Sequence, residues 1–122
     1  MILRNSDIRD LIALTANSLE DEFDDMKAMC DGYADPKQLR IPLKDMDGAK
    51  PHIHGTKNGL HYIFQVAGKP NSWKQKVKKW KALQKYTQVA GGFLMLVVLQ
   101  ENEHELDQFL KTHNFKAKTL VV

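Results

Sequence analysis

The sequence has very little cysteine and no long apolar run, so neither disulfide bonds nor a membrane anchor is expected to support the fold. Of its 122 residues only Cys30 is a cysteine, which excludes a disulfide framework and a four-cysteine zinc site. The longest apolar run, residues 93–99, is much too short to cross a bilayer. The N-terminal segment turns polar after three residues, so no secretory leader is expected. We therefore expect one cytoplasmic domain over residues 1–122, without a membrane partner.

Acidic residues are missing from a long central part of the chain. Residues 48–100 contain nine lysines and no aspartate or glutamate, whereas residues 1–47 contain eleven acids against six lysines and arginines. Residues 101–122 are nearly balanced, with four acids and three lysines. This segregation predicts a positive surface that attracts a polyanion. The alternative is a solvated lysine-rich helix whose charges are balanced by acids from elsewhere in the fold.

Hydrophobic periodicity predicts an α/β domain with a central mixed sheet. Helical spacing from Ile8 to Leu19 indicates a first helix, capped by Ser6 and continuing after a kink through Met29. Strands are expected at 38–43 (a short edge strand), in a hairpin over 51–67, at 93–99 and at 117–122, and further helices between Ser72 and Gly91 and at 102–113. The expected order is helix, two or three antiparallel strands, helix, strand, helix, strand.

The hairpin register follows from its turn. Asn58-Gly59 is a strong two-residue hairpin signal, and it places His52 opposite Gln65 and Ile53 opposite Phe64. Because side chains alternate between faces, one face is apolar and is expected to be the core; its members are Ile53, Tyr62, Phe64 and Val66. The other face is expected to be polar and to carry the candidate site; its members are His52, His54, His61, Gln65 and Ala67.

Pro51-His52 on the first hairpin strand, Gln65-Val66-Ala67 on the second, and the lysine-rich helix that follows resemble the PD-(D/E)xK superfamily. These are the restriction-endonuclease-like proteins, which include Holliday junction resolvases. The resemblance covers residues 5–121 and implies a restriction-endonuclease-like fold. In that family the positions of His52 and Gln65 hold acids that bind Mg²⁺, and the position of Ala67 holds a lysine that activates the attacking water.

This chain departs from that pattern at all three positions. Mg²⁺ prefers carboxylate oxygens, and His52 and Gln65 are poor substitutes for them. Ala67 removes the charged group of the triplet. We therefore expect an inactive, pseudo-nuclease site without a cofactor; Mg²⁺ would be the cofactor only of an active enzyme.

Other residues are candidates to replace the lost catalytic groups. Lys69 lies two positions beyond Ala67 and could supply the missing ammonium group. Carboxylates could come from the first helix or from the turn before the hairpin; the candidates are Glu20, Glu22, Asp45 and Asp47. The simpler interpretation is that these acids are ordinary surface charges.

Three histidines on the predicted polar face raise a separate alternative. His52, His54 and His61 would suit Zn²⁺ better than Mg²⁺ if all three converged. The simpler interpretation is that they are exposed sheet residues.

The lysine-rich helix is the second candidate site. Trp73, Val77, Trp80 and Leu83 follow helical spacing and are expected in the core rather than stacked on bases. The predicted nucleic-acid-binding residues are Lys69, Lys74, Lys76, Lys78, Lys79, Lys81 and Lys85. The sequence thus predicts a nuclease-like module that binds nucleic acid, DNA rather than RNA, without sequence readout. The alternatives are an active Mg²⁺-dependent endonuclease with relocated catalytic residues and a protein-interaction module; a homodimer is compatible with each.

Overall fold

The Asn58-Gly59 turn sets the geometry at the centre of the fold. In the computed structural model, which describes residues 5–39 and 49–122, strands β2 (Ile53–Lys57) and β3 (Leu60–Val66) are antiparallel. Ile53 pairs with Phe64, as predicted. Asn58 and Gly59 have φ values of 52° and 79°, which a two-residue type I′ turn requires. The predicted hairpin register is confirmed.

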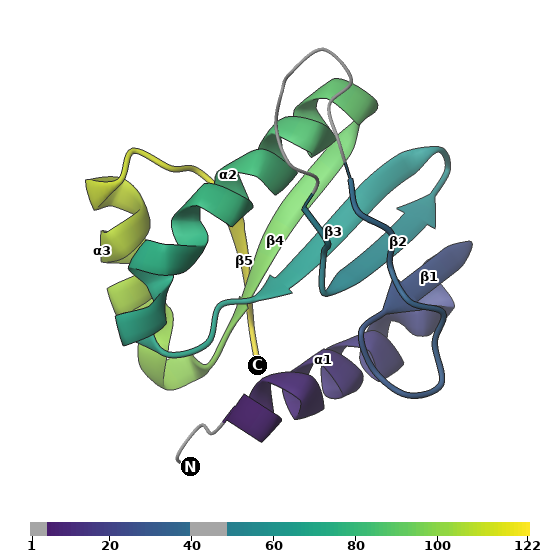
Figure 1. The fold of residues 1–122 in the computed structure, drawn as a ribbon, viewed down its shortest axis with the longest axis horizontal. Helices are drawn as coiled ribbons and strands as arrows, with labels where there is room; N and C mark the ends of the chain where they lie inside the picture. Colours follow the sequence, from purple (N-terminus) through teal and green to yellow (C-terminus); the bar gives the residue numbers. More distant parts are fainter. Residues whose placement is uncertain (1–4, 40–48) are drawn as a thin grey trace.

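Three more strands complete a mixed sheet in the order β1-β2-β3-β4-β5. Strand β1 (Asp25–Ala28) is antiparallel to β2, whereas β4 (Gly92–Val98) and β5 (Lys118–Val121) run parallel to β3. Parallel neighbours need crossover connections, and helices α2 (Trp73–Ala90) and α3 (Glu103–Thr112) supply them (Figure 1). The predicted α/β class with a mixed sheet is confirmed; the elements come in the predicted order, but the third antiparallel strand is β1, in a segment that was predicted to be helical.

The continuation of the first helix through Met29 was a wrong prediction. Helix α1 (Asn5–Leu19) ends in a 3₁₀ turn, Glu20–Glu22, and the chain then enters β1. Three consecutive acids at the C-terminal end of a helix oppose its dipole, which favours termination there. Phe23 then packs edge-on against Tyr62 and Phe64, with ring centroids 5.2 and 5.9 Å apart.

Gly55 makes room for this Phe23 contact. A Cβ atom at Gly55 would lie 2.9 Å from the Phe23 ring, so any side chain there would force the ring to shift. A glycine in mid-strand often marks such a close approach. In the sequence, Gly55 was therefore the feature that indicated another segment packed directly on β2.

Both faces of the sheet are covered, and the face that was predicted to be polar is largely an apolar core. Helix α1 packs on the face of Ile53, Phe64 and Val66, as expected for a core. The opposite face forms a second core, in which Ile63 and Ala67 pack against α2 and α3. Strands with parallel neighbours are normally covered on both sides, and the tryptophans of α2 need an apolar surface on which to bury.

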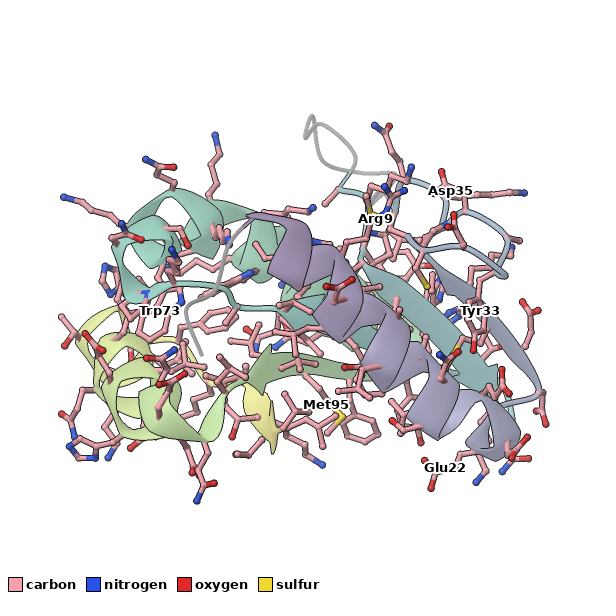
Figure 2. All side chains as sticks on the ribbon, turned by 90° about the horizontal axis from the view of Figure 1, so that it is seen from below. Arg9, Glu22, Tyr33, Asp35, Trp73 and Met95 are labelled. Carbon is pink, nitrogen blue, oxygen red and sulfur yellow. The ribbon has the colours of Figure 1, made fainter. Side chains whose placement is uncertain are left out.

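The tryptophans of α2 belong to this second core. Trp73 and Trp80 are each 1% exposed, and both rings contact Phe109 of α3. Figure 2 shows Trp73 between α2 and α3. The prediction that they are core residues is confirmed.

Two further predictions can be followed only in part. Of the edge strand expected at 38–43, residues 38 and 39 are described, and Leu39 makes an isolated antiparallel bridge with Ala49. The turn expected at 45–48 lies outside the described residues. Within the described ranges no helix is both long and apolar enough to cross a membrane.

Candidate functional site

His52 and Gln65, the two positions that the hairpin register pairs, do lie together. The backbone N–H of His52 donates a hydrogen bond to the Gln65 side-chain oxygen. In return, the Val66 N–H donates to His52 Nδ1 at 3.0 Å. Gln65 is 1% exposed, so its amide has a structural partner rather than an open ligand position. These two hydrogen bonds join the residue before β2 to the end of β3, just beyond the last backbone pair between the two strands.

The environment of His52 keeps its imidazole neutral. Burial, followed by the charges of Lys79 and Lys76, lowers the pKa of His52 to about 4. Because Nδ1 accepts the Val66 N–H, the proton of the neutral ring lies on Nε2. Among residues 5–39 and 49–122, no protein group accepts a hydrogen bond from that Nε2–H. His52 therefore offers one fixed donor at neutral pH.

The stability of the protein should fall on acidification because of His52. Its folded pKa of about 4 lies below the ordinary value of 6.5, so between these values the unfolded chain binds a proton that the folded chain does not. The stabilisation is present above the ordinary pKa and is lost as the pH falls toward 4. We expect His52 alone to lower the free energy of unfolding by roughly 2–3 kcal/mol between pH 7 and pH 4.

Urea denaturation of wild type and His52→Asn across this range measures that contribution. The asparagine oxygen can still accept the Val66 N–H but does not titrate, so the difference between the two proteins isolates the imidazole. A difference that does not change with pH would contradict the buried, neutral His52.

An ammonium group lies beside the position where the PD-(D/E)xK pattern has its lysine. Lys76, on α2, donates from Nζ to the Ala67 carbonyl at 3.0 Å. Gly68 leaves room for it, since a Cβ atom there would lie 2.6 Å from Nζ. Burial and the nearby Lys79 lower the pKa of Lys76. Ala67 itself is fully buried in the core, so a lysine side chain at that position would not fit without repacking.

A second half-buried lysine extends this positive region. Burial and the charge of Lys50 lower the pKa of Lys79, and Lys50 forms an ion pair with Asp35. Two ammonium groups, those of Lys76 and Lys79, thus act on a neutral histidine. Such a group of cations favours an anionic ligand over a divalent metal ion.

A cavity of about 480 Å³ opens next to His52. It lies between the start of α1, the chain just after β1 and the residue before β2. Figure 2 shows Arg9 of α1 near Asp35, with Tyr33 on the same side of the molecule. The cavity is lined by Ile8, Arg9, Ile12, Ala28, Met29, Cys30, Asp31, Tyr33, Asp35 and His52.

Those proposed substitute catalytic residues that the structure describes are not joined to His52. Glu20 is exposed and accepts a hydrogen bond of 2.6 Å from the Tyr33 hydroxyl, which raises the pKa of Tyr33 to about 12. Glu22 and Lys69 are exposed, and no hydrogen bond or ion pair joins either side chain to His52. Asp45 and Asp47 lie outside the described residues.

Two of the three histidines, His54 and His61, are hydrogen-bonded to each other, whereas His52 has a different partner. His54 Nε2 and His61 Nδ1 are hydrogen-bonded at 2.9 Å, and the His61 ring meets Tyr86 of α2 edge-on. His52 is held instead by Val66. Across the described part of the chain, no three histidine, cysteine or acidic side chains are placed to hold a metal ion.

The exposed side of α2 carries the other candidate site. Lysines at spacings of four, three and four residues fall within one narrow stripe on the helix, opposite the tryptophans. This lysine stripe consists of Lys74, Lys78, Lys81 and Lys85, all exposed. None of the four makes an ion pair with any residue in the described ranges.

Comparison with known proteins adds no relative. No protein-family model matches this sequence, and no curated protein or solved structure is significantly similar to it. The geometry of the site therefore carries the functional argument.

Sequence reasoning missed several residues of the site. Arg9, Tyr33 and Lys50 were not singled out, because they come from three separate segments that meet only in the fold. Lys76 was predicted as a nucleic-acid ligand like its neighbours. Lys76 lies between Trp73 and Trp80 on the buried side of α2, and this helical position indicated that its side chain points inward.

Proposed function

We propose that this protein is a nucleic-acid-binding domain with a nuclease-like but catalytically inactive site. The observation that carries the proposal is the lysine stripe of α2. Four exposed ammonium groups on one helix face, without acidic partners in the described structure, are suited to a row of phosphates. The first and last of these lysines are eleven residues apart, which is roughly 16 Å along a helix.

Binding through such a stripe would depend on the phosphate backbone rather than on base sequence. Ammonium groups act as point charges and carry no pattern that distinguishes one base pair from another. DNA is the favoured polymer because the PD-(D/E)xK resemblance implies it. Helix, three antiparallel strands, helix, strand is also the element order on which that resemblance rests.

The inactive site is supported by the chemistry around His52. The two positions at which the resemblance implies Mg²⁺ ligands hold a neutral imidazole and a buried amide, and both hydrogen-bond to the hairpin. Neither provides the carboxylate oxygen that Mg²⁺ prefers. The nearby ammonium groups of Lys76 and Lys79 would repel a divalent cation further.

One observation favours a second candidate, an active endonuclease with a relocated lysine. Lys76 brings its ammonium group beside the Ala67 carbonyl, near the place of the missing catalytic lysine. That group could stabilise charge on a phosphate in the transition state. Within residues 5–39 and 49–122, however, no three histidine, cysteine or acidic side chains are placed to hold the metal that this candidate needs.

We expect no hydrolysis of branched, duplex or single-stranded DNA when the purified protein is incubated with Mg²⁺ or Mn²⁺. The physical reason is that a metal-dependent phosphodiesterase needs both its metal ions and their anionic ligands. The measurement is product formation on labelled substrates, with EDTA as the blank and the Lys76→Met variant as the matched control. Metal-dependent cleavage by wild type that Lys76→Met abolishes would replace this proposal with the active enzyme.

A further inference from the structure

The cavity beside His52 combines an apolar part with a polar edge that includes His52 and Arg9. Ile12, Ala28 and Met29 give it an apolar lining, and Tyr33 adds an aromatic ring. Its volume of about 480 Å³ is in the range of small-molecule sites. This lining suits a flat, uncharged ring system.

The polar side of the cavity is arranged for an anion. His52 lines it with a neutral ring whose Nε2–H has no partner among the described residues. Arg9 lines it from α1, and the Lys76 and Lys79 charges act on His52 from α2. Of the two acids in the lining, Asp35 is already paired with Lys50, and Asp31 is exposed to solvent.

Helix α2 links the surroundings of His52 to the proposed nucleic-acid surface. Lys76 and Lys79 lie on the same helix as the lysine stripe and reach toward His52, whereas the stripe faces away from the core. A strand bound along α2 would therefore have an anion site at the edge of its track. The adjoining cavity is large enough for one nucleotide.

We propose that this cavity binds a single nucleotide, with its base in the apolar part beside Tyr33 and its phosphate at His52 and Arg9. In a bound polymer this would be an unpaired nucleotide, one at a strand end or one extruded from a duplex, because a stacked base cannot enter a pocket. The polymer part of this inference rests on the proposed function. The mononucleotide part stands independently of it.

The test is a titration of the full chain with dAMP, deoxyadenosine and inorganic phosphate, followed by amide chemical shifts in NMR spectra. We expect dAMP to shift the amides of the cavity residues and to bind more tightly than either fragment, since each fragment makes only half of the contacts. Phosphate binding as tightly as dAMP, or shifts confined to the lysine stripe, would overturn the inference.

Two variants make the test specific to the cavity. Cys30→Phe fills the cavity and should weaken dAMP binding by about tenfold or more. Val89→Phe introduces the same ring at an exposed position on α2, and dAMP binding should be unchanged. Arg9→Gln, at an exposed position where folding is not at risk, should weaken dAMP but not deoxyadenosine. Cavity variants that bind dAMP as wild type does would refute the site.

A further variant tests this inference separately from the proposed function. Replacing the four stripe lysines with glutamine should abolish polymer binding and leave dAMP binding intact, because the stripe does not line the cavity. Loss of dAMP binding in this variant would place the nucleotide on the stripe and overturn the cavity site. If wild type binds dAMP in the cavity but binds no duplex, the proposed function fails and the nucleotide site stands.

Discussion

Glutamine at Lys74, Lys78, Lys81 and Lys85 should weaken binding to duplex DNA by roughly two orders of magnitude or more at 0.1 M salt. Each lysine that contacts a phosphate releases a condensed counterion, and this release is a large part of non-specific affinity. Glutamine keeps the length and helix propensity of the side chain, so the fold should persist. The measurement is fluorescence anisotropy with labelled duplexes of several sequences, all of which should lose affinity to a similar extent.

A matched control distinguishes the affinity lost with local phosphate contacts from the affinity lost with net charge. Glutamine at Lys37, Lys57, Lys111 and Lys116 removes the same four charges from other exposed positions. The long-range attraction falls equally in both variants, but only the stripe variant loses phosphate contacts. Equal losses of affinity in the two variants would contradict a binding surface on α2.

Truncation of Trp80 should have the largest effect on stability. Its side chain is 1% exposed and joins α2 to the sheet and to Phe109 of α3, with ring centroids 6.4 Å apart. Removal of a buried tryptophan leaves a cavity that the neighbours fill incompletely. Trp80→Ala is therefore expected to lower the free energy of unfolding by about 3–5 kcal/mol in urea titrations.

The same position distinguishes a core residue from a base-stacking platform. Trp80→Phe retains most of the apolar volume, so it should lower stability less than Trp80→Ala and leave DNA affinity unchanged. A stacking tryptophan would give the opposite pattern, with little change in stability and a loss of affinity. That pattern would contradict the buried position of this side chain.

The hairpin could be predicted because its determinants are local. Asn58-Gly59 fixes the turn, and the turn fixes which residues face one another, so the contact between His52 and Gln65 followed from the sequence. The environment of that pair did not follow. Whether a face is open or covered depends on α2, whose packing involves residues far along the chain.

Strand β1 escaped prediction for a related reason. Residues 25–28 alternate polar and apolar side chains over only four positions, and they become a strand because β2 offers them an edge. The cavity depends in turn on where α1 and the chain after β1 meet His52. Tertiary contacts of this kind leave only faint traces in sequence, such as Gly55 under Phe23 and Lys76 among the tryptophans.

The most direct test of nucleic-acid binding by α2 is the salt dependence of wild-type affinity for duplex DNA. If each of the four stripe lysines contacts one phosphate, a plot of log Kobs against log salt concentration should have a slope of about −3.6 or steeper. The stripe variant should be shallower by about the same amount. No measurable binding at low salt, or a wild-type slope that the stripe variant leaves unchanged, would contradict the proposed function.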